Sequence, residues 1–363
     1  MTVWRNVNFL LSALSIAFGV LIALSTLDWG PWNDEFWTVA STAAGMSVRD
    51  FLGHMYRDQH PILHYGLIYL AQTIGTTDIV ALRSLNLLGL GMVGATLAYA
   101  HRHKAISPAQ IMVVGVVFMS SPLSLSYFSE LRAYFLLYSA SISISVLWWM
   151  LVQRIDQDRS LPPTMIVAWG ACLAIFVNLH YFATIFGGVL TLALLASLAS
   201  RGNWRLAWLI GLVGLAAATP ALLLGAMQAK FSLSGQMGWI TTTLREAIRF
   251  VIRIVKNAAA FNLVAAACAI TAALFLIEDG KRRRQQRNVM VLIGLTALFF
   301  AVMIGLNAMV PMIRDRYLMS AAGAVTVAVA LLAAGPGSRA YNLRIEGDAT
   351  LKRFGTQFLL IVK

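Results

Sequence analysis

Long apolar runs follow one another along most of the chain, and they restrict the possible fold more than any other feature of the sequence. A helix needs about 20 mostly apolar residues to cross the hydrocarbon core of a bilayer. The chain is 59% hydrophobic and 12% charged, whereas soluble domains are about 45–50% apolar and about 25% charged. The sequence therefore predicts an all-α integral membrane protein with about ten transmembrane helices. The predicted spans lie near residues 7–27, 79–100, 108–127, 133–152, 164–180, 182–199, 206–225, 257–277, 289–308 and 316–334.

Basic residues gather at those ends of the apolar runs that fall on one side of the predicted membrane. Such an excess of Lys and Arg marks the cytoplasmic side. Both termini are then cytoplasmic and residues 28–78 lie outside. The outer side is the periplasm or, in a eukaryote, a lumen, and we expect a multi-pass protein of a bacterial inner membrane whose outer loop faces the periplasm. The net charge of +13 follows from this topology, so a nucleic-acid partner is not expected. The clusters are Arg5, residues 101–104, Arg154 with Arg159, Arg201 with Arg205, and residues 281–287.

A polar, aromatic-rich segment, residues 28–78, separates the first two predicted spans. A connection this long is usually functional or disordered, and its Trp, Tyr and Phe residues argue against disorder. Ser47 with Asp50 resembles a capping box, and Pro61 precedes apolar residues at helical spacing. These signals predict short helices on the outer membrane surface. We interpret the segment as the active-site loop of a membrane domain over residues 1–335, which is followed by a cytoplasmic tail over residues 336–363.

Asp34 and Glu35 form a pair of adjacent carboxylates just after the first predicted span. One interpretation is a general base that takes a proton from an acceptor hydroxyl. The other is a helix cap or a pair of solvated acids, because Asp is common where helices begin. The sequence alone leaves both open.

Three arginines, Arg132, Arg314 and Arg316, lie at the outer ends of predicted spans. A planar guanidinium group matches phosphate oxygens with two parallel hydrogen bonds, so these side chains are candidates for holding the phosphate of a lipid. The alternative is contact with lipid headgroups or pairing with neighbouring acids such as Glu130. Arg83, inside the second predicted span near its outer end, is a weaker candidate.

Histidines and tyrosines share the outer side with these charged residues. His60 is interpreted as orienting a phosphate, tuning Asp34 or binding a metal ion with His180, and an ordinary hydrogen-bonded histidine is the alternative. A pair of histidines distant in sequence is a weak metal signal, so no cofactor is assigned and a divalent metal stays open. Four tyrosines either line a sugar site or belong to the interfacial aromatic belt. They are Tyr127, Tyr134, Tyr181 and Tyr317.

Residues 245–256 carry a basic residue at every third or fourth position, which predicts a basic helix on the outer side. Such a helix attracts an anionic lipid-linked donor or, more simply, lipid headgroups. The basic residues are Arg245, Arg249, Arg253 and Lys256.

The order of these motifs resembles that of the GT-C membrane glycosyltransferases. The closest groups are the protein O-mannosyltransferase-like and aminoarabinose-transferase-like enzymes, including the bacterial lipopolysaccharide core transferases. The resemblance is specific over residues 28–134, limited to hydropathy and His180-Tyr181 over residues 135–310, and partial at residues 314–318. The matching motifs are Asp34-Glu35, His60-Pro61-x-Leu63-x-Tyr65, Arg83, Glu130-x-Arg132-x-Tyr134 and Arg316-Tyr317-Leu318.

The resemblance implies a GT-C type fold with a first outer loop of short juxtamembrane helices. It also implies transfer of a sugar from a polyprenyl-phosphate or dolichyl-phosphate donor to a glycan, lipid or protein acceptor on the outer face. Asp34 is then the catalytic base, with Glu35 beside it. The residues expected to bind the substrates are His60, Arg83, Glu130, Arg132, Tyr134, His180, Arg314, Arg316 and Tyr317.

The residues also suit this chemistry when the resemblance is set aside. A lipid phosphate is already a good leaving group, so the site needs positive charge where negative charge grows in the transition state. It also needs a base on the opposite face of the sugar, which makes the reaction inverting. The chain has no glycine-rich loop in a strand–helix setting, and the outer loop has no DxD motif for a nucleotide sugar. A donor that arrives through the bilayer is consistent with both observations.

The chain departs from the family pattern at two places. Ile62 follows Pro61 where the family usually has a second proline, and the chain stops at Lys363, whereas many members continue with further spans or an outer domain. A non-catalytic membrane subunit of a glycan or lipid assembly or transport complex is therefore the alternative to an enzyme. A transporter itself would place ionisable residues at mid-membrane, but the charges here cluster at the ends of the spans.

Overall fold

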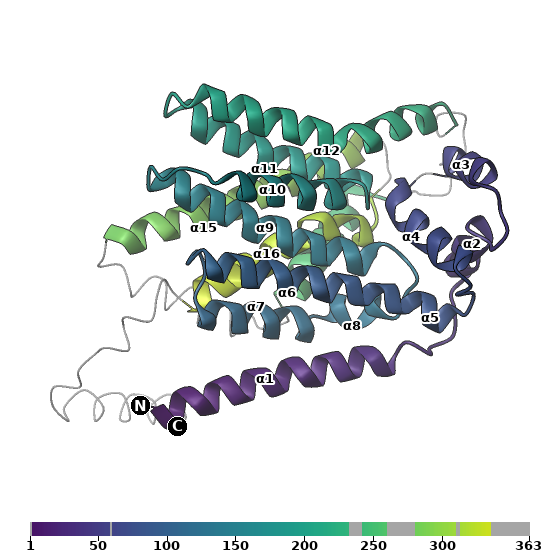
Figure 1. Ribbon diagram of the computed structural model, residues 1–363, viewed down its shortest axis with the longest axis horizontal. Helices are drawn as coiled ribbons and strands as arrows, with labels where there is room; N and C mark the ends of the chain where they lie inside the picture. Colours follow the sequence, from purple (N-terminus) through teal and green to yellow (C-terminus); the bar gives the residue numbers. More distant parts are fainter. Residues whose placement is uncertain (1, 59, 232–241, 260–279, 310–312, 335–363) are drawn as a thin grey trace.

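The computed structural model describes residues 2–58, 60–231, 242–259, 280–309 and 313–334. Within these ranges every regular element is a helix, which confirms the predicted all-α class. The long helices lie side by side in a bundle, with a group of short helices at one end (Figure 1). The predicted span at 257–277 falls almost entirely outside the described residues, and the predicted tail at 336–363 falls wholly outside them.

Most of the helices are labelled in Figure 1. Two of them, η1 and η3, are short 3-10 helices. The elements are α1 (Thr2–Ser25), α2 (Asn33–Ser41), α3 (Val48–Arg57), α4 (Ile62–Thr73), α5 (Ile79–Arg83), η1 (Ser84–Asn86), α6 (Leu87–Arg102), α7 (Pro108–Ser120), α8 (Pro122–Phe128), α9 (Tyr134–Asp156), α10 (Pro163–Val177), α11 (Tyr181–Ala199), α12 (Trp204–Phe231), α13 (Leu244–Ala258), α15 (Gly280–Met309), η3 (Asp315–Leu318) and α16 (Met319–Ala334).

Six helical stretches in the described residues are long and apolar enough to cross a membrane. Helices α7 and α8 together make a seventh only if they count as one span, because they are bent by 57° at their junction. The expected number of about ten is therefore too high for the described part of the chain. The six stretches are Ile79–Arg102, Tyr134–Asp156, Tyr181–Ala199, Trp204–Ala229, Gln285–Met309 and Asp315–Leu332.

Prolines account for two of the differences from the predicted spans. Pro122 opens α8 directly after the Ser121 cap, and a proline at that position cannot continue the preceding helix, so the span predicted at 108–127 is broken. Pro162 and Pro163 stand at the start of α10, which has 15 residues. A helix of that length extends over only about 22 Å, less than the hydrocarbon thickness of a bilayer.

Helix α9 is the central element of the bundle, and its whole apolar stretch is buried. It packs against α6, α10, α11, α15 and α16. The closest approach is to α16 at Gly323, where a Cβ atom would overlap the backbone of Ser141 and Ile142. Ser141 Oγ accepts a hydrogen bond from Gly323 N at 3.1 Å and donates one to Ser320 O at 2.7 Å. A small residue at this crossing lets the two backbones come into contact.

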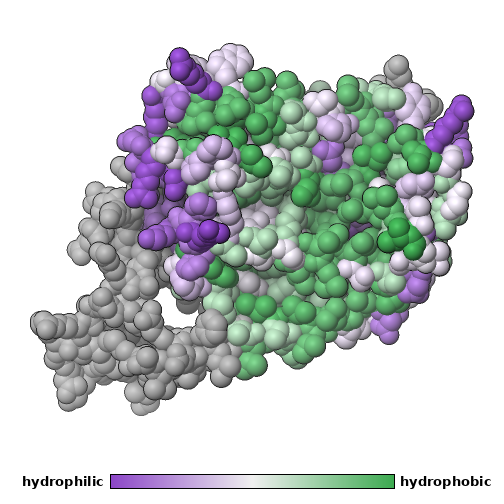
Figure 2. All heavy atoms as spheres, viewed as in Figure 1, coloured by the Kyte–Doolittle hydropathy of each residue, from purple (hydrophilic) through white to green (hydrophobic). Residues whose placement is uncertain are grey.

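The short helices α2, α3 and α4 gather at one end of the bundle (Figure 1). Ser47 caps α3 by accepting a hydrogen bond from Asp50 N at 3.1 Å, and Pro61 directly precedes α4. The sequence signals for these two helices are thus confirmed. Figure 2 shows hydrophilic residues gathered at this end and at the opposite end, with an apolar band between them. This distribution and the long apolar helices are consistent with a multi-pass integral membrane protein.

We expect Gly323→Ala to destabilise the fold by about 1–3 kcal/mol or more, because the added methyl group has to push α16 away from the backbone of α9. Thermal unfolding of the purified protein in detergent measures the effect. Gly294→Ala in α15 is the matched control, since nothing lies within 4 Å of its Cβ position. Equal melting temperatures for the two variants would contradict the close approach.

Candidate active site

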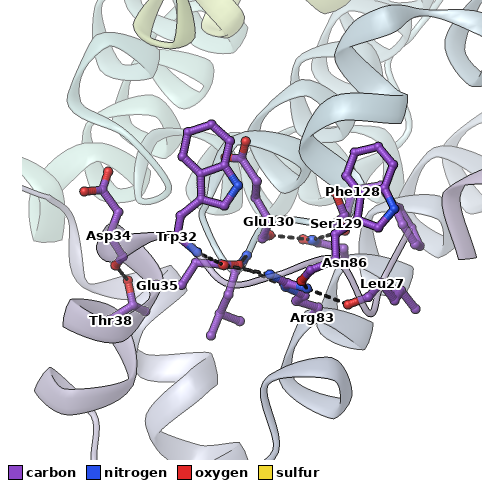
Figure 3. Close-up of polar contacts among 12 residues, drawn as sticks. Leu27, Trp32, Asp34, Glu35, Thr38, Arg83, Asn86, Phe128, Ser129 and Glu130 are labelled. Carbon is purple, nitrogen blue, oxygen red and sulfur yellow. Dashed lines mark hydrogen bonds and ion pairs between the residues drawn. The ribbon is translucent and has the colours of Figure 1, made fainter. Parts of the chain in front are cut away.

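A buried ion pair organises the turn that follows α1. Arg83, at the end of α5, donates from Nη2 to Glu35 Oε2 at 2.7 Å and from Nε to Glu35 Oε1 at 3.0 Å. Its Nη1 donates to the backbone oxygens of Leu27 and Trp29 at 2.6 and 2.5 Å. Figure 3 shows these contacts converging at the start of α2. The pair therefore ties the end of the first helix, α2 and α5 together.

Glu35 uses both carboxylate oxygens for contacts inside the protein. It also accepts from the backbone amides of Trp32 at 2.8 Å and Leu131 at 2.5 Å. The side chains of Glu35 and Arg83 are 0% and 1% exposed. Burial raises the pKa of Glu35, but the hydrogen bonds from Arg83, Leu131 and Trp32 outweigh that effect, so the pKa lies below its usual value. The sequence predicted catalysis for Glu35 and substrate binding for Arg83, whereas this geometry fits a positioning role for both.

Asp34 points away from its neighbour Glu35 (Figure 3). Its side chain is 47% exposed, and its Oδ2 lies 3.4 Å from Arg316 Nη1 and 3.8 Å from Arg132 Nη2. The fold therefore brings together three side chains that are far apart in the sequence. Both contacts are longer than those of a bidentate ion pair, so they are weaker than such a pair would be.

These three side chains face a cavity of about 370 Å³, a volume within the range of small-molecule sites, about 300–1,000 Å³. Asp315, which also lines it, pairs with Arg253 of α13 at 3.0 Å. Arg314 lines the cavity without an ion pair to any residue in the described ranges. The lining residues are Trp32, Asp34, Glu35, Tyr127, Glu130, Arg132, Arg314, Asp315 and Arg316.

The ring of Tyr134 supports the two arginines that contact Asp34. The guanidinium carbon of Arg132 lies 5.9 Å from the ring centroid, and that of Arg316 lies 5.6 Å from it. Attraction between each cation and the ring offsets part of the repulsion between the two positive charges. Tyr134 is 1% exposed, which fits this support better than the substrate contact expected from the sequence. Arg316 Nε is buried and has no hydrogen-bond partner among the described residues.

Glu130 is a second carboxyl group in the cavity, in a different environment from Asp34. Burial is the main cause that raises the pKa of Glu130, and the negative charge of Glu35 raises it further. Arg316 and Arg132 act in the opposite direction, and the resulting pKa is about 7. A carboxyl group whose pKa is raised by burial and by specific charged neighbours is typical of functional sites.

His60 and His64 line a second, much smaller cavity together with Arg132 and Tyr134. His60 Nδ1 lies 2.7 Å from Asp58 Oδ1. The pKa of His64 is lowered to about 3, mainly by burial, and electrostatic interactions with Arg132 and His60 act in the same direction. His64 is therefore neutral at physiological pH.

His180 lies between these histidines and Tyr317. Its ring centroid is 6.2 Å from that of His60 and 5.1 Å from that of Tyr317. Its Nδ1 accepts a hydrogen bond from Phe182 N at 3.3 Å, which caps α11. Burial is again the main cause that lowers the pKa of His180. These contacts place His60, His180 and Tyr317 beside the arginines as part of their packing.

A catalytic metal site usually takes three protein ligands. Among the residues that the structure describes, no three His, Cys, Asp or Glu side chains are arranged to hold a metal ion. His60 and His180, the candidate ligands from the sequence, lie close together, but no third such side chain in the described ranges is in a suitable position.

Two residues at this end carry contacts that sequence reasoning did not single out. Asp58 is the partner of His60. Gln228 of α12 donates to the backbone oxygens of Met55 and His60 at 2.6 and 3.2 Å, and its Oε1 accepts from Tyr181 OH at 2.6 Å. A polar side chain near the end of a long apolar helix is itself a signal of such a contact.

No family model, curated protein or solved structure matches this chain. Its function must therefore be argued from the convergence of charged side chains on one cavity. Of the residues expected at the site, the cavity is lined by Asp34, Glu35, Glu130, Arg132, Arg314 and Arg316. Those beside or behind it are His60, Arg83, Tyr134, His180 and Tyr317.

We expect Arg83→Met to cost about 3–5 kcal/mol of folding free energy, because it leaves Glu35 as a buried carboxylate without its counter-ion. Thermal unfolding in detergent measures the loss. Arg57→Met, at the exposed end of α3, is the control for removing one arginine from the same region. The double variant Glu35→Met with Arg83→Met should recover part of the loss. A single Arg83→Met variant as stable as Arg57→Met would exclude the organising role of the pair.

The raised pKa of Glu130 predicts a pH-dependent stability. The folded state holds this proton up to a pH of about 7, while the unfolded state releases it at the ordinary pKa of 4.5. The folded state therefore binds more protons in this interval, and stability falls as the pH rises through it. In Glu130→Gln the melting temperature should change less between about pH 5 and pH 8 than in the unaltered protein. Asp158→Asn, at an exposed position, should leave the slope unchanged. A Glu130→Gln variant with an unaltered slope would contradict the raised pKa.

Proposed function

We propose that the chain is an inverting glycosyltransferase that takes a sugar from a polyprenyl-phosphate donor and passes it to an envelope acceptor on the periplasmic face of a bacterial inner membrane. The observation that carries the proposal is the convergence of Asp34, Arg132 and Arg316 on one cavity at the end of an apolar helical bundle. The resemblance of the motifs to those of the GT-C membrane glycosyltransferases supports the same reading.

Asp34 acts as the general base in this proposal. Its half-exposed carboxylate accepts the proton of an acceptor hydroxyl, and the hydroxyl oxygen then forms a bond to the anomeric carbon of the donor sugar. The bond from that carbon to the phosphate oxygen breaks, and the electron pair leaves with the phosphate. Attack from the side opposite the phosphate inverts the configuration. Positioned proton transfer of this kind contributes about 10²–10⁴-fold to the rate.

Arg132, Arg314 and Arg316 stabilise the departing phosphate in this proposal. Negative charge grows on the phosphate oxygens as the bond to the sugar breaks, and fixed cations are most effective at such a point. The long contacts of Arg132 and Arg316 with Asp34 support this role, because hydrogen-bonding capacity is left for a phosphate. Arg316 Nε, which has no hydrogen-bond partner among the described residues, supports it too. A phosphate that draws the two guanidinium groups toward itself also frees Asp34 to take a proton.

We expect Asp34→Asn to lower sugar transfer by about 10²–10⁴-fold while expression and melting temperature stay close to those of the unaltered protein. Transfer is measured with the purified chain, a polyprenyl-phosphate sugar and an acceptor extract from the cell envelope. Asp28→Asn, an exposed acid of the same loop, should retain full transfer. A stable Asp34→Asn protein with normal transfer would remove the base, and a pure chain without transfer would favour the non-catalytic subunit.

A further inference from the structure

We propose that α13 (Leu244–Ala258) is a docking surface for the anionic phospholipid headgroups of the membrane leaflet beside the candidate site. The proposal concerns lipid binding alone and does not depend on the reaction proposed for the cavity. It follows from the different character of three faces of this helix. One face packs against the protein, one is apolar and exposed, and one carries a row of basic residues.

One face of α13 is packed against the bundle. Ala247, Ile254 and Ala258 are buried there, and the helix contacts α8, α15, α16 and η3. Ser121 Oγ donates to Asn257 O at 2.8 Å, and Thr242 Oγ1 donates to Ile313 O at 2.8 Å. These contacts hold the helix at the end of the bundle that carries the candidate site.

A second face of α13 is apolar and exposed. Four residues recur at helical spacing along it, and at about 100° per residue they fall within an arc of about 80°. They are Leu244 at 52% exposure, Ile248 at 43%, Ile252 at 61% and Val255 at 37%. A continuous apolar stripe at the end of a membrane bundle suits the boundary between acyl chains and headgroups.

The third face is a row of basic residues that adjoins the apolar stripe. It contains Arg245, Arg249, Arg253 and Lys256, each one position after a member of the apolar stripe. The row extends over about 16 Å, which is longer than one phosphate group can contact. The helix has one acid, Glu246, and the capping box engages it by hydrogen bonds from Thr243 N and Oγ1 at 2.8 and 2.9 Å. The helix thus carries four basic residues and one acid, which its own cap engages.

An apolar stripe next to a basic row is the arrangement of a helix that lies in an anionic membrane surface. A soluble acidic partner would match the basic row but not the apolar stripe at membrane depth, so charge and hydropathy together favour the leaflet. The row meets the candidate site at Arg253, which pairs at 3.0 Å with Asp315, a residue that lines the cavity. The docked leaflet would therefore adjoin the cavity.

The test uses the full-length protein in detergent micelles doped with phosphatidylglycerol and phosphatidylcholine, and native mass spectrometry counts the bound lipids. We expect the protein to retain phosphatidylglycerol in preference to phosphatidylcholine. Arg245→Gln with Arg249→Gln should weaken phosphatidylglycerol binding about thirtyfold, since each cation near an anionic surface contributes about fivefold. Both positions are exposed and lie outside the cavity lining, so the melting temperature should not change.

The matched control is Arg49→Gln with Arg57→Gln, which removes two exposed charges from α3 at the same end of the protein. This control should bind phosphatidylglycerol normally. Ile248→Ser with Ile252→Ser should weaken the binding of both lipids by removing the apolar stripe. Equal retention by the α13 and α3 charge variants, or no preference in the unaltered protein, would overturn the proposal.

A competition experiment with added polyprenyl phosphate tells whether α13 binds phospholipids of the leaflet or the lipid-linked donor. If α13 docks the leaflet, phosphatidylglycerol should stay bound at saturating polyprenyl phosphate. The opposite outcome is that each bound polyprenyl phosphate displaces one phosphatidylglycerol, and that this exchange is absent in the Arg245→Gln with Arg249→Gln variant. That outcome would show that α13 belongs to the donor site and would overturn the proposal. Failure of sugar transfer leaves these lipid measurements unaffected, so the two proposals can fail independently.

Discussion

The ion pair between Arg83 and Glu35 is the interaction on which the geometry of the end with the short helices α2, α3 and α4 depends. Both side chains are buried, and an unpaired charge at such a place is costly, so the pair holds only because each partner is satisfied by several hydrogen bonds. Those bonds come from the turn after α1, from the start of α2 and from the segment before α9. Three parts of the chain are thereby held together. Asp34 is the residue before Glu35 on α2, about 100° around the helix, and is turned toward the cavity as a result.

A second electrostatic constraint at the cavity is the closeness of two positive charges. Arg132 and Arg316 both approach Asp34, and both lie against the ring of Tyr134. One carboxylate and one aromatic face together offset the repulsion of the two cations. At the opposite end of the bundle a buried acid, Asp156, also binds several donors from different parts of the chain. Asp156 accepts from Arg201, Arg287 and Asn288 at 2.6–2.8 Å and so joins α9, α15 and the turn before α12. Charges thus tie both ends of the bundle, while its middle is apolar.

Much of the fold was predictable because local signals decide it. Apolar runs, the Ser47 cap and Pro61 correctly indicated an all-helical chain with short helices at one end. For the described part of the chain the span count was too high, because hydropathy averages over about 20 residues and does not register a break such as the one before Pro122. The candidate site was predictable in part. Asp34, Arg132 and Arg316 were expected on one side of the membrane. The contacts of both arginines with the carboxylate of Asp34 are consistent with that expectation.

The sequence by itself determined the helical class, the apolar bundle and the set of charged residues available at the ends of the helices, because these follow from composition and from neighbours a few positions away. Tertiary structure decided which of two adjacent acids is buried in an ion pair with Arg83 and which is half-exposed beside Arg132 and Arg316. The partners that settle this lie 48 and 96 residues from Glu35 and 282 residues from Asp34. Helical periodicity in the sequence relates residues only a few positions apart, so it cannot predict these contacts. Two carboxylates that look equivalent in the sequence acquire different surroundings only when distant donors reach one of them.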